Sequence, residues 1–384
     1  MLSRFYMPKG LKSEYKRLSD VSYKRSEPLQ VAAVENATVL TPQKDTVNHG
    51  LDKATYGLGG VIDSEDRFID YSLMDAGKCV TVSNLCRKRF GGRYDIEASE
   101  VIENDREVIY IGLFWPQWGH FLVDIITRLW YALENELPVV FIKKDKELYG
   151  NYLELIELLG ISKDRIIYVD KPTRFKKVYV PEPAFYPGKY YTDKYNAMID
   201  RAVQEARFRC SGKQAFSKVY FSRTRIGSAE IGEISIEKVM KDNGFEIFYP
   251  ETLSAAEQIY YVNSSEVFAA VEGTISHNSV FASERTKQIV FLRSIVPIVF
   301  QFQINEMKNI SADYVYSTAG NLPLIRKNGF LVEPRLLCIS RYFKKYAAEN
   351  GIGTGSASAV DFCRHYLVYV LKWIKKFVKV KILK

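Results

Sequence analysis

The sequence predicts an α/β protein with two Rossmann-like, doubly wound domains that face a cleft, followed by a C-terminal amphipathic helix. Three observations support this prediction. From about residue 108, short buried strands alternate with segments of helical periodicity, which is the pattern of a parallel sheet covered on both faces. A polar, turn-rich stretch at 211–218 divides this alternation into two halves. The final segment combines lysines and large apolar residues at helical spacing.

The first half contains four predicted strands and three predicted helices. The strands are expected at 107–114, 138–144, 165–170 and 176–183, and the helices at 118–133, 146–160 and 193–209. Gly160 ends the second helix, and prolines stop the last strand. Residues 1 to about 105 mix charges, turn residues and short apolar runs, and they predict no definite order of elements.

The second half alternates more regularly. Strands are expected at 218–223, 245–250, 266–271, 287–293 and 312–317, with helices at 236–244, 254–262, from 276 onward and between the last two strands. Ser254 and Glu257 form a capping box at the start of one helix. We therefore expect one domain at 1–210, a second domain at 211–335 and C-terminal helices at 336–384.

Composition limits the class of protein. The 384 residues are 47% hydrophobic and 26% charged, as in a globular chain. The five cysteines are odd in number and form no CxxC pair, which argues against a disulfide framework and a zinc site and fits a reducing compartment. No apolar run is long enough for a secretory signal or a transmembrane helix, so we expect a cytoplasmic protein.

The net charge of +9 is concentrated in the tail. Seven of the 54 Lys and Arg residues lie from Arg364 onward without any acid, so the rest of the chain carries only about +2. This distribution argues against a nucleic-acid partner. Four lysines share one stripe of a helix: Lys372, Lys375, Lys376 and Lys379. We expect 364–384 to associate with an anionic membrane surface; packing of the apolar side on the domain is the alternative.

The first candidate site is the loop 271–278, VEGTISHN, between a predicted strand and a predicted helix. Open α/β sheets bind ligands at the carboxyl ends of their strands, and a helix start offers free amides to a phosphate. Gly273 allows close approach of a ligand. The polar residues of this loop are Glu272, Thr274, Ser276, His277 and Asn278. An ordinary capped helix start is the alternative.

Two further candidates follow the same reasoning. Arg223 and Arg225 in SRTR follow the strand KVYF, and a guanidinium there suits a diphosphate, although a surface ion pair is the simpler alternative. His120 and Asp124 are four residues apart on a predicted helix, so they share a face and can act as a base with its orienting partner. A helix-start histidine bound to its own backbone is the alternative. Walker A, GxSxG and DxD motifs are absent from the sequence.

Several segments together resemble glycosyltransferase family 61. SKVYFSRTR followed by GFEIFYPETLSAAEQIYYVNSSEVFAAVEGTISHNSVFA resembles the C-terminal half of that family, and WGHFLVDIITRLW resembles its N-terminal H-x-L-x-D-x-x-x-RL element. The matching segments cover roughly 108–135 and 218–295. The sequence departs from the family in two places. Many members have an HGA loop where this chain has Glu272-Gly273-Thr274. Many members also have a basic residue followed by NE after the SR element, where this chain has Glu-Ile-Gly-Glu at 230–233.

The resemblance implies a GT-B-like fold and an inverting, metal-independent glycosyltransferase without a cofactor. It implies a glycan or lipid-linked acceptor held by an acceptor-side domain at 1–210, a nucleotide-sugar donor held by a nucleotide-sugar domain at 211–335, and a role in bacterial capsular or exopolysaccharide synthesis. The basic tail adds the expectation that the enzyme associates with the inner face of the cytoplasmic membrane. The donor-binding residues would be Arg223, Arg225, Glu257, Gly273, Thr274, Ser276, His277 and Asn278. The base stays open between Asp124, His120 and Glu272. A non-catalytic sugar-binding subunit and a polysaccharide pyruvyltransferase-like enzyme are the alternative functions.

Overall fold

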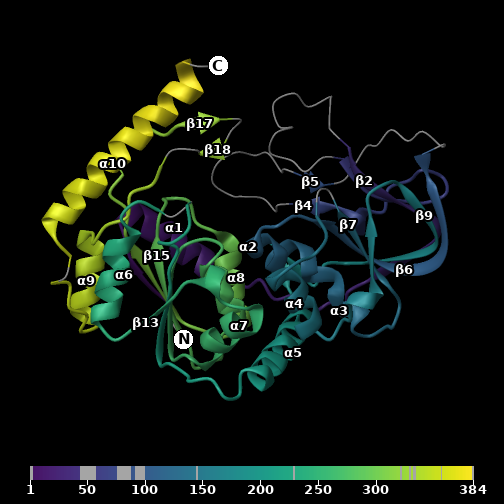
Figure 1. The fold of residues 1–384 in the computed structure, drawn as a ribbon, viewed down its shortest axis with the longest axis horizontal. Helices are drawn as coiled ribbons and strands as arrows, with labels where there is room; N and C mark the ends of the chain where they lie inside the picture. The colour runs from purple at the N-terminus through teal and green to yellow at the C-terminus, as the bar shows by residue number, and fades with distance from the viewer. Residues whose placement is uncertain are drawn as a thin grey trace. The chain divides into compact units, whose positions relative to one another are not determined.

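The computed structural model describes residues 3–43, 58–75, 88–90, 100–143, 146–227, 230–320, 322–327, 330–331, 334–355 and 357–382. These residues form an α/β protein with two compact units (Figure 1). Unit 1 comprises Met1–Ser22 and Cys210–Lys384, and unit 2 is the continuous segment Tyr23–Arg209. The prediction places the first 22 residues in the N-terminal domain, whereas the structure groups them with the second half of the chain. Cys79 and Cys86 lie outside the described residues.

Unit 1 contains a parallel sheet of six strands in the order β1-β16-β15-β14-β12-β13. The strands are β1 (Arg4–Tyr6), β12 (Lys218–Phe221), β13 (Glu246–Phe248), β14 (Val267–Val271), β15 (Lys287–Leu292) and β16 (Ala312–Tyr316). The chain adds β13 on one side of β12 and β14 on the other, so the strand order reverses between β12 and β14. Ligands of open α/β sheets bind at such a point.

Helices cover both faces of this sheet. They are α1 (Lys9–Ser19), α6 (Glu233–Asp242), α7 (Ala255–Ser264), α8 (Val299–Met307) and α9 (Arg341–Glu349). On one face, Phe343 of α9 stacks on Phe291 of β15. On the other face, Tyr15 of α1 and Phe302 of α8 pack on Tyr314 of β16. Figure 1 shows α6 and α9 on one side of the strands and α7 and α8 on the opposite side.

The short strand β1 attaches the first residues to unit 1. Arg4 donates from Nε and Nη2 to the carboxylate of Asp313 at 2.8 and 2.6 Å, and Lys287 pairs with the same carboxylate at 2.7 Å. Arg4 and Asp313 are 309 residues apart in the chain. A three-residue strand with so distant a partner leaves no local signal in the sequence.

Unit 2 contains a mixed six-stranded sheet in the order β3-β2-β9-β6-β7-β8. The strands are β2 (Val31–Gln43), β3 (Leu58–Ile62), β6 (Ile102–Phe114), β7 (Val139–Lys143), β8 (Ile166–Val169) and β9 (Thr173–Pro181). β6 to β9 run parallel, but β2 pairs antiparallel with β9 and with β3. The sheet therefore differs from the predicted parallel one, because β2 and β3 lie in the part of the sequence that predicted no definite element.

The predicted helix at 118–133 is broken into four short pieces. They are α2 (Trp118–His120), a π turn (Phe121–Ile125), a 3₁₀ turn (Ile126–Arg128) and α3 (Leu129–Ala132). Single π turns inside helices occur frequently at functional sites. The other helices of unit 2 are α4 (Asn151–Leu158) and α5 (Asp193–Arg209), the second with the predicted bounds.

The C-terminal helix α10 (Ala359–Phe377) continues into a π turn (Val378–Ile382). None of the helices in the described part of the chain combines the length and apolarity needed to cross a membrane. The remaining short elements are β4 (Met74–Asp75), β5 (Lys88–Phe90), β10 (Phe185–Tyr186), β11 (Tyr190–Tyr191), β17 (Arg326–Lys327), β18 (Phe330–Leu331) and the 3₁₀ turns Asp70–Ser72, Lys163–Arg165, Pro250–Thr252 and Ser276–Phe281.

Candidate functional site

Each unit carries polar side chains at the carboxyl edge of its sheet. In unit 1, Phe221 of β12 is level with Ala270 of β14, so the residues that follow these two strands reach the same edge. They are the segments 222–225 and 272–274, both of which sequence reasoning singled out. This edge lies where the strand order reverses, which is the position that binds ligands in related sheets.

Arg223 and Arg293 form the basic part of this edge. Arg223 is partly buried, and both burial and the charge of Arg293 lower its pKa. Arg293 follows β15, and its Nη1 donates to Glu230 at 2.5 Å. The buried Nε of Arg293 has no hydrogen-bond partner among the described residues. The charges of Glu230 and Glu233 offset part of the repulsion between the two guanidinium groups, and an anion that binds both arginines would offset more of it.

Gly273 makes room for Arg293. Its φ of +120° is one that side chains rarely adopt, and a Cβ atom there would lie 2.7 Å from Nη2 of Arg293. Glu272 fixes the backbone on the other side, because its Oε2 accepts from the backbone N of Arg293 at 3.4 Å and from Ser294 Oγ at 3.3 Å. The Glu-Gly pair of the loop therefore positions Arg293.

Glu272 itself points into unit 1. Its residue surface is 4% exposed, and Oε1 accepts a hydrogen bond from the Tyr15 hydroxyl of α1 at 3.1 Å. Burial raises the pKa of Glu272, while the charge of Arg293 opposes the increase. A carboxyl group so enclosed is poorly placed to take a proton from a substrate that arrives from solvent.

Two buried glutamates of α6 fix the loop after β12. Glu233 Oε1 accepts from the backbone N of Arg223 at 2.9 Å, and burial raises the pKa of Glu233 to about 7. Glu237 Oε2 accepts from the hydroxyls of Ser222 and Thr224, both at 2.5 Å. Sequence reasoning assigned no role to Glu233, Glu237 or Arg293. For Arg293 a signal existed, since it ends a predicted strand.

Ser276, His277 and Asn278 are buried beneath the loop, with 0%, 3% and 1% of their surfaces exposed. Gln301 of α8 accepts from Ser276 Oγ at 2.8 Å and lies 2.9 Å from Nδ1 of His277. The predicted helix start is a six-residue 3₁₀ turn. These three side chains hold the loop in place, whereas Thr274 is partly exposed.

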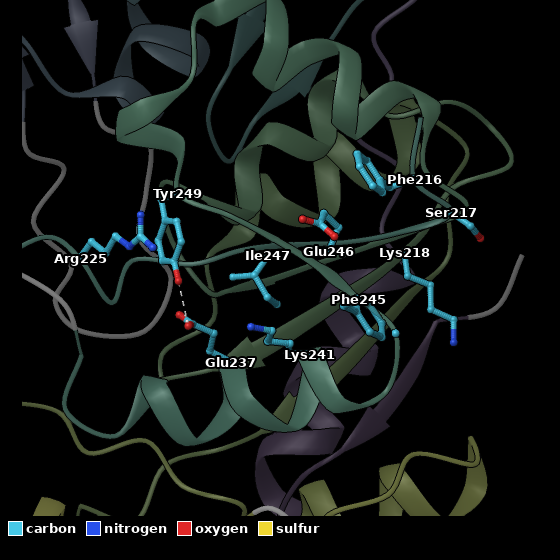
Figure 2. A pocket seen from close by; sticks show the side chains of 11 residues that line it. Phe216, Ser217, Lys218, Arg225, Glu237, Lys241, Phe245, Glu246, Ile247 and Tyr249 are labelled. Carbon is cyan, nitrogen blue, oxygen red and sulfur yellow. Dashed lines mark hydrogen bonds between the residues drawn. The ribbon is translucent and has the colours of Figure 1, made fainter. Parts of the chain in front are cut away.

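Arg225 and Glu257, two further predicted donor-binding residues, make other contacts. Arg225 is exposed and covers the ring of Tyr249 at 3.5 Å, and the Tyr249 hydroxyl donates to Glu237 at 3.0 Å. Figure 2 shows these three side chains at one end of a pocket of about 630 Å³ along β13. Glu257 completes the capping box of α7 and pairs with Lys213 at 2.7 Å, which is a structural role.

In unit 2, His120 and Asp124 follow the carboxyl end of β6. The strand order of this sheet reverses between β6 and β9, so the pair lies beside a second reversal point. His120 Nδ1 is hydrogen-bonded to Asp124 Oδ2. The imidazole is 18% exposed and the carboxylate 5%. A carboxylate on Nδ1 orients the ring and favours the tautomer whose Nε2 accepts a proton, as general-base catalysis requires.

Arg128, one turn further on, has a structural role. Its guanidinium is buried and donates to four backbone carbonyls. Nε and Nη2 reach Tyr71 O at 3.0 and 2.5 Å, Nη2 reaches Leu73 O at 2.9 Å, Nε reaches Pro181 O at 3.1 Å, and Nη1 reaches Ile111 O at 3.3 Å. The arginine of the RL element therefore joins β6, the end of β9 and the turn at 70–73.

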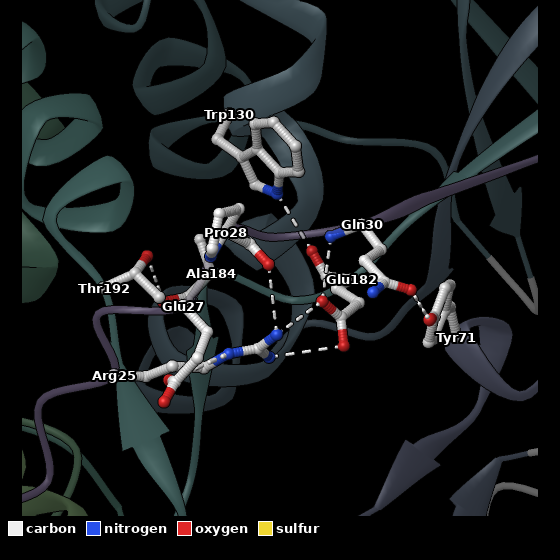
Figure 3. Close-up of polar contacts among 9 residues, drawn as sticks. All are labelled: Arg25, Glu27, Pro28, Gln30, Tyr71, Trp130, Glu182, Ala184 and Thr192. Carbon is white, nitrogen blue, oxygen red and sulfur yellow. Dashed lines mark hydrogen bonds and ion pairs between the residues drawn. The ribbon is translucent and has the colours of Figure 1, made fainter.

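The acid at the end of β9 is also engaged in structural contacts (Figure 3). Glu182 accepts two hydrogen bonds from Arg25, at 2.9 and 3.2 Å, and one from the backbone N of Gln30 at 2.9 Å. Its carbonyl accepts from Trp130 Nε1 at 2.9 Å. Of the polar side chains at this edge, the His120–Asp124 pair remains the candidate for chemistry.

Comparison with known proteins adds one likeness. Residues 118–289 match the family model described as Glycosyltransferase 61, and comparison with curated proteins gives no match. The matched region starts beside His120 and ends in β15, so it contains Asp124, Arg223 and Glu272. This match supports a glycosyl-transfer enzyme at a coarse level. Within the described residues, no group of three or more His, Cys, Asp or Glu side chains is arranged to hold a metal ion.

Proposed function

We propose that the chain is an inverting, metal-independent glycosyltransferase that moves a sugar from a nucleotide-sugar donor to a glycan or lipid-linked glycan acceptor. Beyond the family match, one observation carries the proposal. Arg223 and Arg293 follow strands at the edge where the strand order of a parallel sheet reverses, their charges act on one another, and Gly273 makes room for Arg293. Such an edge with two guanidinium groups suits the diphosphate of a nucleotide sugar.

In this proposal the two units act as the domains of a GT-B enzyme. Unit 1 binds the donor through Arg223 and Arg293, with Thr274 beside them and Ser276, His277 and Asn278 supporting the loop. Unit 2 receives the acceptor. As the resemblance implies, the reaction belongs to bacterial capsular or exopolysaccharide synthesis at the cytoplasmic face of the membrane.

The chemistry is a single displacement. The acceptor hydroxyl attacks the anomeric carbon and gives its proton to His120, which Asp124 orients through Nδ1. The bond to the nucleoside diphosphate breaks, and its electron pair leaves on the diphosphate. Arg223 and Arg293 stabilise that negative charge, so the positive charge that a metal would supply comes from the protein. We prefer His120 with Asp124 over Glu272 as the base, because Glu272 is enclosed by Tyr15 and Ser294.

A nucleotide panel tests the donor assignment. Full-length protein is screened by thermal shift with UDP, GDP, dTDP, ADP and CMP and with their common sugars, since a ligand of the folded state raises the melting temperature. Arg223→Gln should weaken binding of the nucleotide that the wild type prefers by about tenfold, because one charge-assisted contact is lost. Arg285→Gln, at an exposed arginine of unit 1, is the matched control. Equal affinity of the Arg223 variant and the control would remove Arg223 from the site.

A turnover assay tests the reaction with the donor so identified. His120→Gln should retain donor binding and lower turnover about 10²- to 10⁴-fold, the usual contribution of a general base. Turnover should persist in EDTA; loss restored by Mn²⁺ would contradict the metal-free mechanism. Donor binding without turnover on any acceptor would favour the sugar-binding subunit. Release of phosphate from phosphoenolpyruvate would identify a pyruvyltransferase.

A further inference from the structure

Helix α10 has apolar side chains on two faces, and only one of these faces packs on unit 1. Tyr369 is 2% exposed and packs with Ile231 and Leu336. Trp373, one turn later, donates from Nε1 to Pro323 O at 2.9 Å. These contacts anchor the middle of α10, the yellow helix of Figure 1, to the rest of unit 1.

The second apolar face is open to solvent. Leu367, Leu371 and Ile374 are spaced i, i+4, i+7, and they are 63%, 67% and 48% exposed. Val360, two turns before Leu367, is 62% exposed on the same side. Large aliphatic side chains gathered in this way on a soluble surface mark a place where something docks.

A basic stripe lies directly beside this open face. At 100° per residue, Lys375 falls about 40° beyond Leu371, and Lys379 and Lys372 follow at about 80° and 100°, between the open apolar face and Tyr369. Lys376, the fourth lysine of the predicted stripe, falls beside Tyr369. Lys372, Lys375 and Lys379 are exposed. The sequence from Arg364 onward contains no acid that would neutralise them. Around the axis the order is therefore packed face, open apolar face, basic stripe.

We propose that α10 docks unit 1 onto an anionic membrane surface and lies parallel to it. Leu367, Leu371 and Ile374 enter the acyl boundary, and the lysines contact acidic headgroups. Interfacial helices have this combination of an apolar face and a flanking row of lysines. Charge selects the lipid over a second copy of the chain, because two copies meeting on this face would bring two basic stripes together. This inference is independent of the proposed glycosyl transfer.

Vesicle flotation with the full-length protein tests the proposal. Vesicles of phosphatidylcholine alone are compared with vesicles that contain one quarter phosphatidylglycerol, at low and high salt. The protein should float with the anionic vesicles, float at least about tenfold less with the neutral ones, and dissociate as salt rises. Equal flotation with both compositions, or none with either, would overturn the proposal.

Two matched pairs of variants assign the binding to α10. Leu371→Glu with Ile374→Glu should reduce vesicle binding at least tenfold, whereas the same change at Phe208 and Ile102, exposed apolar residues of unit 2, should not. Replacement of Lys372, Lys375 and Lys379 by Gln should also reduce vesicle binding at least tenfold. The same replacement of three exposed lysines of α1, Lys9, Lys12 and Lys16, should leave vesicle binding unchanged.

The variants also separate lipid from a second copy. Sedimentation of wild-type protein without vesicles should show no association that depends on α10. A dimer that Leu371→Glu with Ile374→Glu abolishes would assign the open face to a second copy and overturn the membrane proposal. Circular dichroism of each variant verifies that the fold is retained.

Discussion

Glu233 makes the loop after β12 sensitive to pH. Its carboxyl group is fully buried, accepts from the backbone N of Arg223, and has a pKa raised to about 7 by burial. Its Oε2 has no hydrogen-bond partner among the described residues. Ionisation of Glu233 therefore places a charge in the core of unit 1, next to the backbone of Arg223, which is a candidate residue for binding the nucleotide-sugar donor.

Glu233→Gln should remove this pH dependence. In the wild type the unfolded state ionises near pH 4.5 and the folded state near pH 7. The folded state thus holds the extra proton between these values, and the free energy of unfolding falls as pH rises through that window. The free energy of unfolding of the variant should rise relative to that of the wild type by on the order of 3 kcal/mol between pH 4.5 and pH 8. Urea unfolding across this range measures it; parallel pH profiles would contradict the assignment.

At the scale of elements, the broken helix 118–132 combines a candidate catalytic pair with a structural arginine. The π turn lies between His120 and Arg128, and the two ends of the segment have different tasks. His120 is bonded to Asp124 near the surface, while Arg128 binds backbone carbonyls of β6 and of the turn at 70–73. The family-like motif thus joins a candidate catalytic pair and a structural arginine in one short stretch.

Arg128→Met should destabilise unit 2 by about 3–5 kcal/mol. Methionine keeps much of the apolar stem but removes the donors to Tyr71, Leu73, Ile111 and Pro181, which leaves buried carbonyls unsatisfied. Chemical denaturation followed by circular dichroism measures the loss. Arg106→Met, at an exposed arginine of β6, is the control and should change stability little. Similar stability of both variants would show that the carbonyls find other donors.

Elements with a local signal could be predicted from the sequence, and elements with a distant partner could not. α5 has the predicted bounds because its periodicity and flanking turns are contained in its own residues. The capping box at Ser254 and Glu257 forms for the same reason. β1 was missed because its partner β16 lies far along the chain. β2 was missed although β3 is the next strand, because it lies in a region that mixes charges with short apolar runs and its other partner, β9, is distant. The strand-end rule located Arg223, but no pattern reveals that Ser276–Asn278 face inward, since α8 supplies Gln301 from a distance.

At the scale of the whole chain, unit 2 is an insertion within unit 1. The segment Tyr23–Arg209 is continuous, whereas unit 1 is assembled from Met1–Ser22 and Cys210–Lys384. The two parts of unit 1 are joined by the pairing of β1 with β16 and by the ion pair of Arg4 with Asp313. Unit 2 has its own sheet and core, and unit 1 depends on both of its parts.

This organisation predicts different behaviour of the two units in isolation. Residues 23–209 expressed alone should unfold in one cooperative transition in a thermal melt. Residues 210–384 alone should melt at a lower temperature than residues 1–22 joined to 210–384 by a glycine-serine linker. The reason is that β16 has no β1 beside it in the shorter protein. Equal melting temperatures with and without 1–22 would show that β1 contributes no stability.

The pairing of β1 with β16 also sets a timetable for synthesis on the ribosome. Arg4 and Asp313 are 309 residues apart, so at about 5–20 residues per second β1 waits on the order of 15–60 s for its partner to be made. Unit 2 is complete and able to fold during that interval. The nascent chain thus holds a finished inner unit while the short strand at its beginning, with Phe5 and Tyr6, stays unpaired. A chaperone that binds exposed aromatic residues would act during this period.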